Sequence, residues 1–222
     1  MELKNVLNFL KELRENNNKE WFHANKPKYQ AALADFTVFT EALIREIAPF
    51  DRDIASLRAK DCIFRIYRDI RFSKDKTPYK SNFGAAFVKG GKKSLNAAYY
   101  IHIEPGNAFC GGGIWMPPGN VLKAVRQEVY YHSEEFMRIL ENKKFKETFG
   151  HLGGDRLQRP PVGFPKDFPH VELLKYKSYV VMKSIPDKRL LSGDLLEEVK
   201  GDFKTMQPFI LFLNRAVGNM SQ

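Results

Sequence analysis

The residues best suited to bind an anion are concentrated between Arg65 and Lys80. An arginine guanidinium presents a planar pair of donors to a phosphate or carboxylate, and a lysine adds a point charge. Such groups on one loop could hold a phosphate-bearing small molecule, a nucleotide or a nucleic acid, with Asp69 orienting one guanidinium. An alternative interpretation stays open, in which Asp69 and Asp75 pair with the arginines and only fix the loop. The expected ligand-binding residues are Arg65, Arg68, Asp69, Arg71, Lys74, Lys76 and Lys80.

His102 and Glu104 form a second group that could do chemistry. In a strand they would share one face with Tyr100, while Tyr99, Ile101 and Ile103 would take the other. A carboxylate beside an imidazole can tune it as a general base, so an enzyme with this acid–base pair, and with arginines stabilising an oxyanion, is an alternative function. An ordinary polar sheet face is the plainer explanation. The spacing of the other histidines completes no metal-ligand set, so we expect no metal site, and no cofactor is indicated.

Glycines and aromatic residues near these groups allow further interpretations. Gly111 to Gly113 could approach a ligand closely or form an anion-binding nest, but a strand bulge is the expectation we favour. Aromatic side chains interleaved with cations are typical of surfaces that bind single-stranded nucleic acid. We expect Tyr67 and Tyr79 to be exposed for such a role. The core is expected to take Phe83, Phe87 and Tyr99.

The overall charge agrees with an acidic partner. The chain of 222 residues has 36 Lys and Arg against 26 Asp and Glu, a formal net charge of +10. Ten cationic and three acidic residues lie between Lys60 and Lys93. A nucleic acid or a small anion fits this balance, and so does a third hypothesis, an interaction module for an acidic protein. No apolar run is long enough for a membrane span. Cys62 and Cys110 are expected to be buried, reduced thiols, and the protein to be cytoplasmic.

The elements that must position these residues follow from apolar spacing and from capping residues. Strands are expected at about 62–67, 82–88, 95–104, 108–115 and 179–182. In the first strand, Phe64 and Ile66 would face the core, and Arg65, Tyr67 and Asp69 the other side. Helices are expected at about 2–15, around Trp21 and Phe22 after an asparagine cap, from Pro27 to Pro49, after Pro117 and Pro118, at 133–140, and after Ser192 with a kink or break at Pro208. This pattern predicts an α+β fold, a mostly antiparallel meander sheet packed against several helices, in a single domain over residues 1–222.

Four segments together carry a family resemblance. The most distinctive is the continuous run from Phe64 to Lys80. The others are Asn16-Asn17 with Trp21-Phe22, Asn25 and Tyr29; Tyr100 to Gly106 with Gly112 to Pro117; and Leu157, Pro160, Gly163-Phe164, Pro169 and Leu173 to Lys175. In this order they cover nearly the whole chain, which resembles the domain of unknown function 2461 family, a mainly bacterial group. The resemblance implies one domain and brings no activity, cofactor or site residue.

Overall fold

The structure is a computed structural model that describes residues 3–221. Its fold is α+β, as the sequence predicts. The strands are β1 (Phe83–Val88), β2 (Ala98–Ile103), β3 (Ala108–Ile114) and β4 (Tyr179–Ile185). The helices are α1 (Lys4–Glu15), α2 (Lys19–Ala24), α3 (Lys26–Ile47), η1 (Arg52–Ile54), α4 (Ala59–Cys62), α5 (Gly119–Tyr131), α6 (Ser133–Glu141), α7 (Lys143–Phe149), α8 (Val171–Leu174), α9 (Asp187–Leu190), α10 (Leu195–Gly218) and η2 (Asn219–Ser221).

The four strands form one antiparallel sheet in the order β1-β2-β3-β4. The first three make the expected meander, and β4 returns to the same sheet after the helices α5 to α8, also as expected. Tyr100 of β2 lies opposite Gly111 of β3, and Gly111 lies opposite Met182 of β4. The hairpin of β2 and β3 therefore lies beside β4, which is about seventy residues further along the chain.

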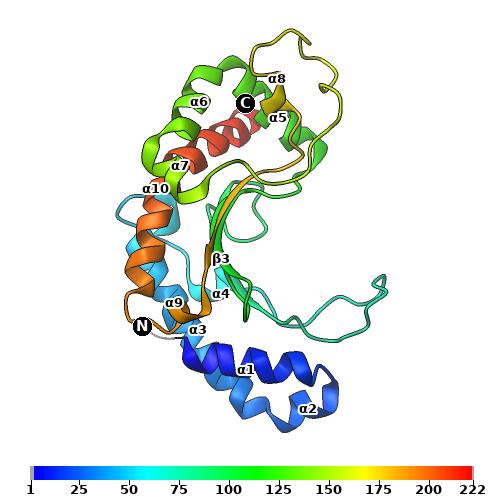
Figure 1. Cartoon of the computed structure of the whole chain (residues 1–222), viewed down its shortest axis with the longest axis vertical. Helices are drawn as coiled ribbons and strands as arrows, with labels where there is room; N and C mark the ends of the chain where they lie inside the picture. Colours follow the sequence, from blue (N-terminus) through cyan, green and yellow to red (C-terminus); the bar gives the residue numbers. More distant parts are fainter. Residues whose placement is uncertain (1–2, 222) are drawn as a thin grey trace.

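Helices cover only one face of this sheet. Tyr99, Ile101 and Ile103 of β2 are buried on that face, and the Tyr99 ring lies 5.3 Å from the ring of Phe203 in α10. Figure 1 shows an arched molecule with α3 and α10 on the convex side of the sheet, and no helix formed by residues 3–221 lies on the concave side. The alternate residues of β2, Tyr100 and His102, face that concave side. The predicted separation of the two faces of β2 is thus confirmed.

The glycines of β3 do not form the expected bulge. Gly111, Gly112 and Gly113 keep regular pairing with both β2 and β4. Their role is close packing: a Cβ on Gly111 would lie 2.5 Å from the carbonyl oxygen of Val181. A Cβ on Gly112 would overlap the carbonyl oxygen of Ala98 and the Met206 sulfur of α10. The absence of side chains here also leaves the concave face hollow in its middle.

The strand expected at 62–67 is wrong. Part of this segment belongs to the short helix α4, which ends at Cys62. The start of α4 is capped by the Asp61 carboxylate, which accepts a hydrogen bond from the Arg58 backbone N–H at 3.2 Å. The chain beyond it is extended but pairs only through isolated bridges, Ile63 with Ala85 and Tyr67 with Tyr79. Ile66 is buried as expected, whereas Phe64 is 37% exposed. The alternation of residue types over 62–67 is that of a strand, but this extended segment pairs with another strand only at isolated positions.

The helices agree better with the sequence. Asn18 caps α2, accepting a hydrogen bond from the Trp21 N–H at 2.9 Å, and Phe22 is buried against α1 and α3. The first helix is confirmed over Lys4–Glu15, and its expected start at Glu2 lies outside the described residues. α10 runs through Pro208 without a break, although its ribbon changes direction along its length in Figure 1. Its N-cap is Asp194 instead of Ser192, and the short helices α7, α8 and α9 were not predicted.

Two further expectations concern the chain as a whole. One cluster of buried hydrophobic residues extends from Leu3 to Ala216. That the chain forms a single domain stays a prediction. Between residues 3 and 221, no helix is both long enough and apolar enough to cross a membrane.

Replacing Gly113 with alanine is expected to lower the free energy of unfolding by about 1–3 kcal/mol. The new Cβ would overlap the Tyr179 carbonyl oxygen, and the φ of +120° at this residue favours glycine. Urea denaturation measures the effect. Gly201→Ala in α10, where nothing lies within 4 Å of the new Cβ, is the control and should stabilise the fold by about 0.5–1 kcal/mol. Equal stability of Gly113→Ala and the parent protein would contradict this account.

Candidate functional site

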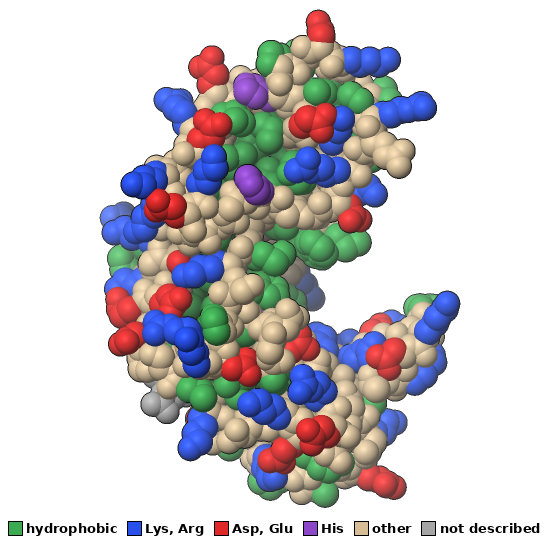
Figure 2. Space-filling view, viewed as in Figure 1, with side chains coloured by type: hydrophobic (Ala, Val, Ile, Leu, Met, Phe, Trp, Pro, Cys, Tyr) green, Lys and Arg blue, Asp and Glu red, His purple; other side chains and the backbone are tan. Residues whose placement is uncertain are grey.

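The uncovered face of the sheet forms a cleft of about 770 Å³. We call this space the sheet cleft. Its floor is made by small residues of the strands, among them Ala86, Ala98 and the three glycines of β3. Figure 2 shows the molecule hollowed on this side, with hydrophobic side chains lining the hollow. A mostly apolar cleft with a few polar groups is typical of a binding site.

Five rings line the sheet cleft. Those of His102 and Phe109 stack on each other, with centroids 4.7 Å apart and planes inclined by 14°. Trp115, which follows β3, is 64% exposed although it is one of the largest side chains. Of the five rings, those of Phe64 and Trp115 are exposed, and the other three are partly buried. Exposed rings on a sheet offer stacking surfaces to planar ligands. The five rings are those of Phe64, Tyr100, His102, Phe109 and Trp115.

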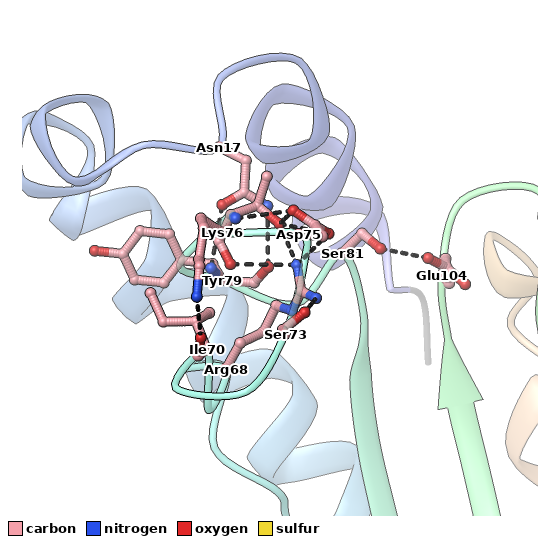
Figure 3. A network of polar contacts seen from close by, with 10 residues as sticks. Asn17, Arg68, Ile70, Ser73, Asp75, Lys76, Tyr79, Ser81 and Glu104 are labelled. Atoms are coloured by element: carbon pink, nitrogen blue, oxygen red, sulfur yellow. Dashed lines mark hydrogen bonds and ion pairs between the residues drawn. The ribbon is translucent and has the colours of Figure 1, made fainter.

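Residues 65–80, which we call the basic arm, project from the body beside the sheet cleft. Figures 1 and 2 show this segment reaching outward, with lysine and arginine side chains along it. The Arg68 guanidinium crosses the arm, donating to Asp75 Oδ2 at 2.5 Å and to the Thr77 hydroxyl (Figure 3). Thr77 donates its backbone N–H to Asp75 Oδ1 at 2.9 Å. Arg68 and Asp75 therefore cross-link the arm, and these hydrogen bonds lower the pKa of Asp75 to about 2.

The base of the arm is fastened to the N-terminal helices. The Asn17 side chain accepts from the Tyr79 N–H at 3.1 Å and donates to the Tyr79 carbonyl at 3.0 Å. The Tyr79 ring stacks on Phe22 at 3.9 Å, so Tyr79 is buried and its expected exposure is wrong. Tyr67, by contrast, is 49% exposed as expected. The buried positions of Phe83, Phe87 and Tyr99 are also confirmed.

The cations of the arm fall into paired and unpaired groups. Asp69 binds Arg71, with Arg71 Nη2 donating to Oδ2 at 2.7 Å, and the hydrogen bonds from Arg71 lower the pKa of this carboxylate. Lys76 donates to the carbonyl oxygen of Ile70 at 3.0 Å. Within residues 3–221, Arg65 and Lys74 form no ion pair or hydrogen bond through their side chains, and both are exposed. The interpretation that pairs both aspartates with arginines agrees with these contacts, and ligand binding by the arm stays a prediction.

Lys80 joins the arm to the sheet cleft. Its ammonium group lies 5.7 Å from the centre of the Phe64 ring, and the side chain lines the cleft. Burial, and then the positive charge of Arg65, lower the pKa of Lys80. Lys80 is the one expected ligand-binding residue that lines the cleft. His102, a candidate for acid–base catalysis, lines the cleft as well.

A hydrogen-bonded chain runs from Tyr100 through His102 to Glu104. His102 Nε2 lies 3.2 Å from Glu104 Oε2, and its Nδ1 lies 3.1 Å from the Tyr100 hydroxyl. Glu104 also accepts from Ser81 at 2.5 Å (Figure 3) and from Asn107 at 2.9 Å. The expectation that Tyr100, His102 and Glu104 share a face is confirmed.

The pKa shifts of Tyr100, His102 and Glu104 indicate where the protons of this hydrogen-bonded group lie. Burial alone would raise the pKa of Glu104, but hydrogen bonds from Ser81, Asn107 and His102 outweigh it and lower the pKa. Burial lowers the pKa of His102, against the opposing effect of Glu104, so the imidazole is neutral at pH 7. Because an ionised carboxylate only accepts, Nε2 carries the proton, and Nδ1 accepts from the Tyr100 hydroxyl. Burial, and then Glu104, raise the pKa of Tyr100 to about 12.

Other reactive groups of the described chain do not join this site. Cys62 and Cys110 are buried free thiols, as predicted, and burial raises the pKa of Cys62 to about 12. Within residues 3–221, no cluster of three or more His, Cys, Asp or Glu side chains is placed to hold a metal ion.

Several cleft residues escaped the sequence-based reasoning. The sequence pattern predicts that Phe64 faces the core, whereas its side chain lines the cleft. It predicts no role in the cleft for Trp115 or for Met182, which is 49% exposed on the same face. The sequence contains one signal for the exposure of Trp115. The residue is followed by Met116, Pro117 and Pro118, which do not continue the alternating pattern of a strand with a buried face.

Comparison with known proteins identifies a family and nothing more specific. Residues 5–212 match the family model described as conserved hypothetical protein DUF2461. No curated protein and no solved structure matches the chain.

Changing Glu104 to glutamine is expected to lower the pKa of His102 further, because the carboxylate charge that favours the imidazolium is removed. NMR titration of the His102 ring measures this shift, and His102→Gln identifies its signal among the five histidines. In the parent protein the ring should titrate below 6.5. Titration above that value, or an upward shift in Glu104→Gln, would contradict the proton assignment.

The lowered pKa of His102 also determines how the stability of the fold changes with pH. The unfolded chain binds the His102 proton more tightly than the folded chain, since the folded-state pKa lies below about 6.5. His102 therefore destabilises the fold as the pH falls through 6.5 towards its folded-state pKa.

Proposed function

We propose that the chain, which belongs to the DUF2461 family, binds single-stranded nucleic acid across the sheet cleft. The observation that carries the proposal is the row of rings on an uncovered sheet face beside the basic arm. Bases would stack on the rings, and the phosphates would contact the cations of the arm. Both contacts are needed for binding that tolerates many sequences.

The shape of the site supports a single strand over a duplex. The rings of Tyr100, His102 and Phe109 lie on the sheet between the cleft walls, where only unstacked bases can reach them. Trp115 and Phe64 extend the row of rings beyond β2 and β3, which gives room for more than one base. A mononucleotide would use only part of this surface.

The charge distribution supports the path of the phosphate backbone. Arg65 and Lys74 are exposed and form no ion pair or side-chain hydrogen bond among the described residues. The charge of Arg65 adds to the hydrogen bonds from Arg71 in lowering the pKa of Asp69. A phosphate that contacts Arg65 or Lys74 therefore displaces no hydrogen bond. Lys80 adds a cation at the cleft wall. Arg68 differs, because its contacts with Asp75 and Thr77 give it a structural role in holding the arm.

The Tyr100–His102–Glu104 chain favours a second candidate function, acid–base catalysis on the bound ligand. His102 is neutral and is oriented by Glu104, and its Nδ1 is in contact with a hydroxyl that lines the cleft. Because both ring nitrogens are engaged, the Tyr100 hydroxyl is the group that would meet a ligand. It would take a proton from the ligand while it passes its own proton to Nδ1, so His102 would act as the base through Tyr100. An interaction with an acidic protein stays a prediction that no feature of the cleft specifically favours.

Binding should fall about tenfold when Trp115 is changed to alanine, because one base would lose its stacking partner. Fluorescence anisotropy with labelled single-stranded DNA and RNA measures the affinity. Trp115 is 64% exposed, so the fold should not suffer. Tyr131→Ala is the matched control, since Tyr131 is 72% exposed but lies outside the cleft lining, and it should bind like the parent protein.

The same assay tests the arm. The affinity should decrease with salt, with a slope of about −0.7 for each phosphate contact, and Arg65→Ala/Lys74→Ala should reduce that slope. Lys146→Ala, a change of an exposed lysine in α7, should leave it unchanged. Absence of binding at low salt, or binding that ignores both the Trp115 and the arm variants, would contradict the proposal.

If the second candidate function is right, His102→Gln should lower product formation by at least about 100-fold while affinity stays within about twofold. The measurement is cleavage of end-labelled single-stranded RNA and DNA, resolved by gel electrophoresis. Stable substrates in the presence of the parent protein would contradict phosphodiester cleavage and leave binding as the function.

A further inference from the structure

Phe72 is the most exposed aromatic side chain among the described residues. It lies at the tip of the basic arm and is 96% exposed. The nearest group described beside its ring is the Arg71 guanidinium, whose carbon lies 5.9 Å from the ring centre. Such a side chain contributes almost nothing to folding, because it buries no apolar surface. The ring is therefore free to contact another molecule.

The arm holds this ring on a fixed support. The Ser73 N–H donates to the Ile70 carbonyl at 3.4 Å and closes a turn that contains Phe72. Lys76 donates to the same carbonyl, and below it Arg68 joins the two sides of the arm through Asp75 and Thr77. A preorganised support reduces the entropy that is lost when a partner binds.

We propose that Phe72 is a wedge that inserts at the junction between a duplex and the single strand bound in the sheet cleft. This inference rests on the proposed function. Proteins that separate or kink stacked bases insert apolar side chains between base steps, and cations beside them contact the phosphates. Lys74, two residues from Phe72, forms no ion pair and provides such a cation, while Arg71 and Lys76 add positive charge although they are bound to Asp69 and to the Ile70 carbonyl.

The connection between arm and cleft favours this occupant. Lys80 ends the arm and lines the cleft, so a strand that left the cleft beside Lys80 could continue along the arm towards its tip. A duplex entering from the solvent would meet Phe72 before its strands reach the rings of the sheet. A membrane-inserting loop would need more apolar surface than one phenylalanine, and Asp69 and Asp75 add negative charge to this arm.

The experiment compares a single strand with a duplex that carries a single-stranded overhang. A 2-aminopurine at the first base pair of the junction reports unstacking by a rise in its fluorescence. The parent protein should raise this fluorescence and bind the junction about tenfold more tightly than the blunt duplex. Phe72→Ala should lose the fluorescence rise and the preference for the junction, with single-strand affinity within twofold of the parent.

Two variants provide the controls. Tyr131→Ala removes an exposed aromatic residue elsewhere and should behave as the parent protein does. Lys74→Ala should weaken binding to the single strand and the junction equally, because it removes only charge. A circular dichroism spectrum identical to that of the parent establishes that Phe72→Ala is folded.

The outcomes separate this inference from the proposed function. An unchanged fluorescence rise in Phe72→Ala overturns the wedge while single-strand binding stands. Equal loss of affinity for both nucleic acids in this variant overturns it too, since Phe72 would then be one more stacking residue. Binding to phosphatidylserine vesicles that depends on Phe72, without a junction signal, would assign the tip to a membrane and overturn the wedge. Failure of the parent protein to bind any single strand overturns both proposals.

Discussion

The packing of α10 against one face of the sheet is the constraint on which the rest of the structure depends. Tyr99 meets Phe203, and Gly112 leaves just enough room for Met206. Because the strands have two faces and the helices cover one, the alternate side chains of β2 and β3 remain on the concave side. The rings of the sheet cleft and the Tyr100–His102–Glu104 chain are there for this reason.

Sequence patterns predicted this arrangement where local periodicity determines it. The meander, the helices α1 to α3 and the common face of Tyr100, His102 and Glu104 follow from spacing within one segment. The cleft itself could not be predicted, because its glycines, Trp115 and Met182 meet through pairing with β4, far along the chain. The exposure expected for Tyr79 was wrong for a related reason. Its burial depends on Phe22 in α2 and on Asn17 in the loop before it, both far from Tyr79 in the sequence.

The charges of the arm illustrate a second limit. Residue types indicated that the aspartates and arginines between residues 65 and 80 could pair, and the structure contains such pairs. Which partners are chosen depends on the folded path of the loop. Arg68 reaches Asp75 because the arm turns back on itself, while Asp69 takes Arg71 two residues away. That choice leaves Arg65 and Lys74 as the cations available to a ligand.

The contacts of Asn17 and Phe22 with Tyr79 couple the base of the arm to the N-terminal helices. Two hydrogen bonds join Tyr79 to Asn17, in the loop between α1 and α2, and the Tyr79 ring stacks on Phe22 of α2. The position of the arm therefore depends on the position of α1 and α2. An engineer who shortens or fuses the chain near α1 would change the geometry of a surface more than sixty positions away in sequence.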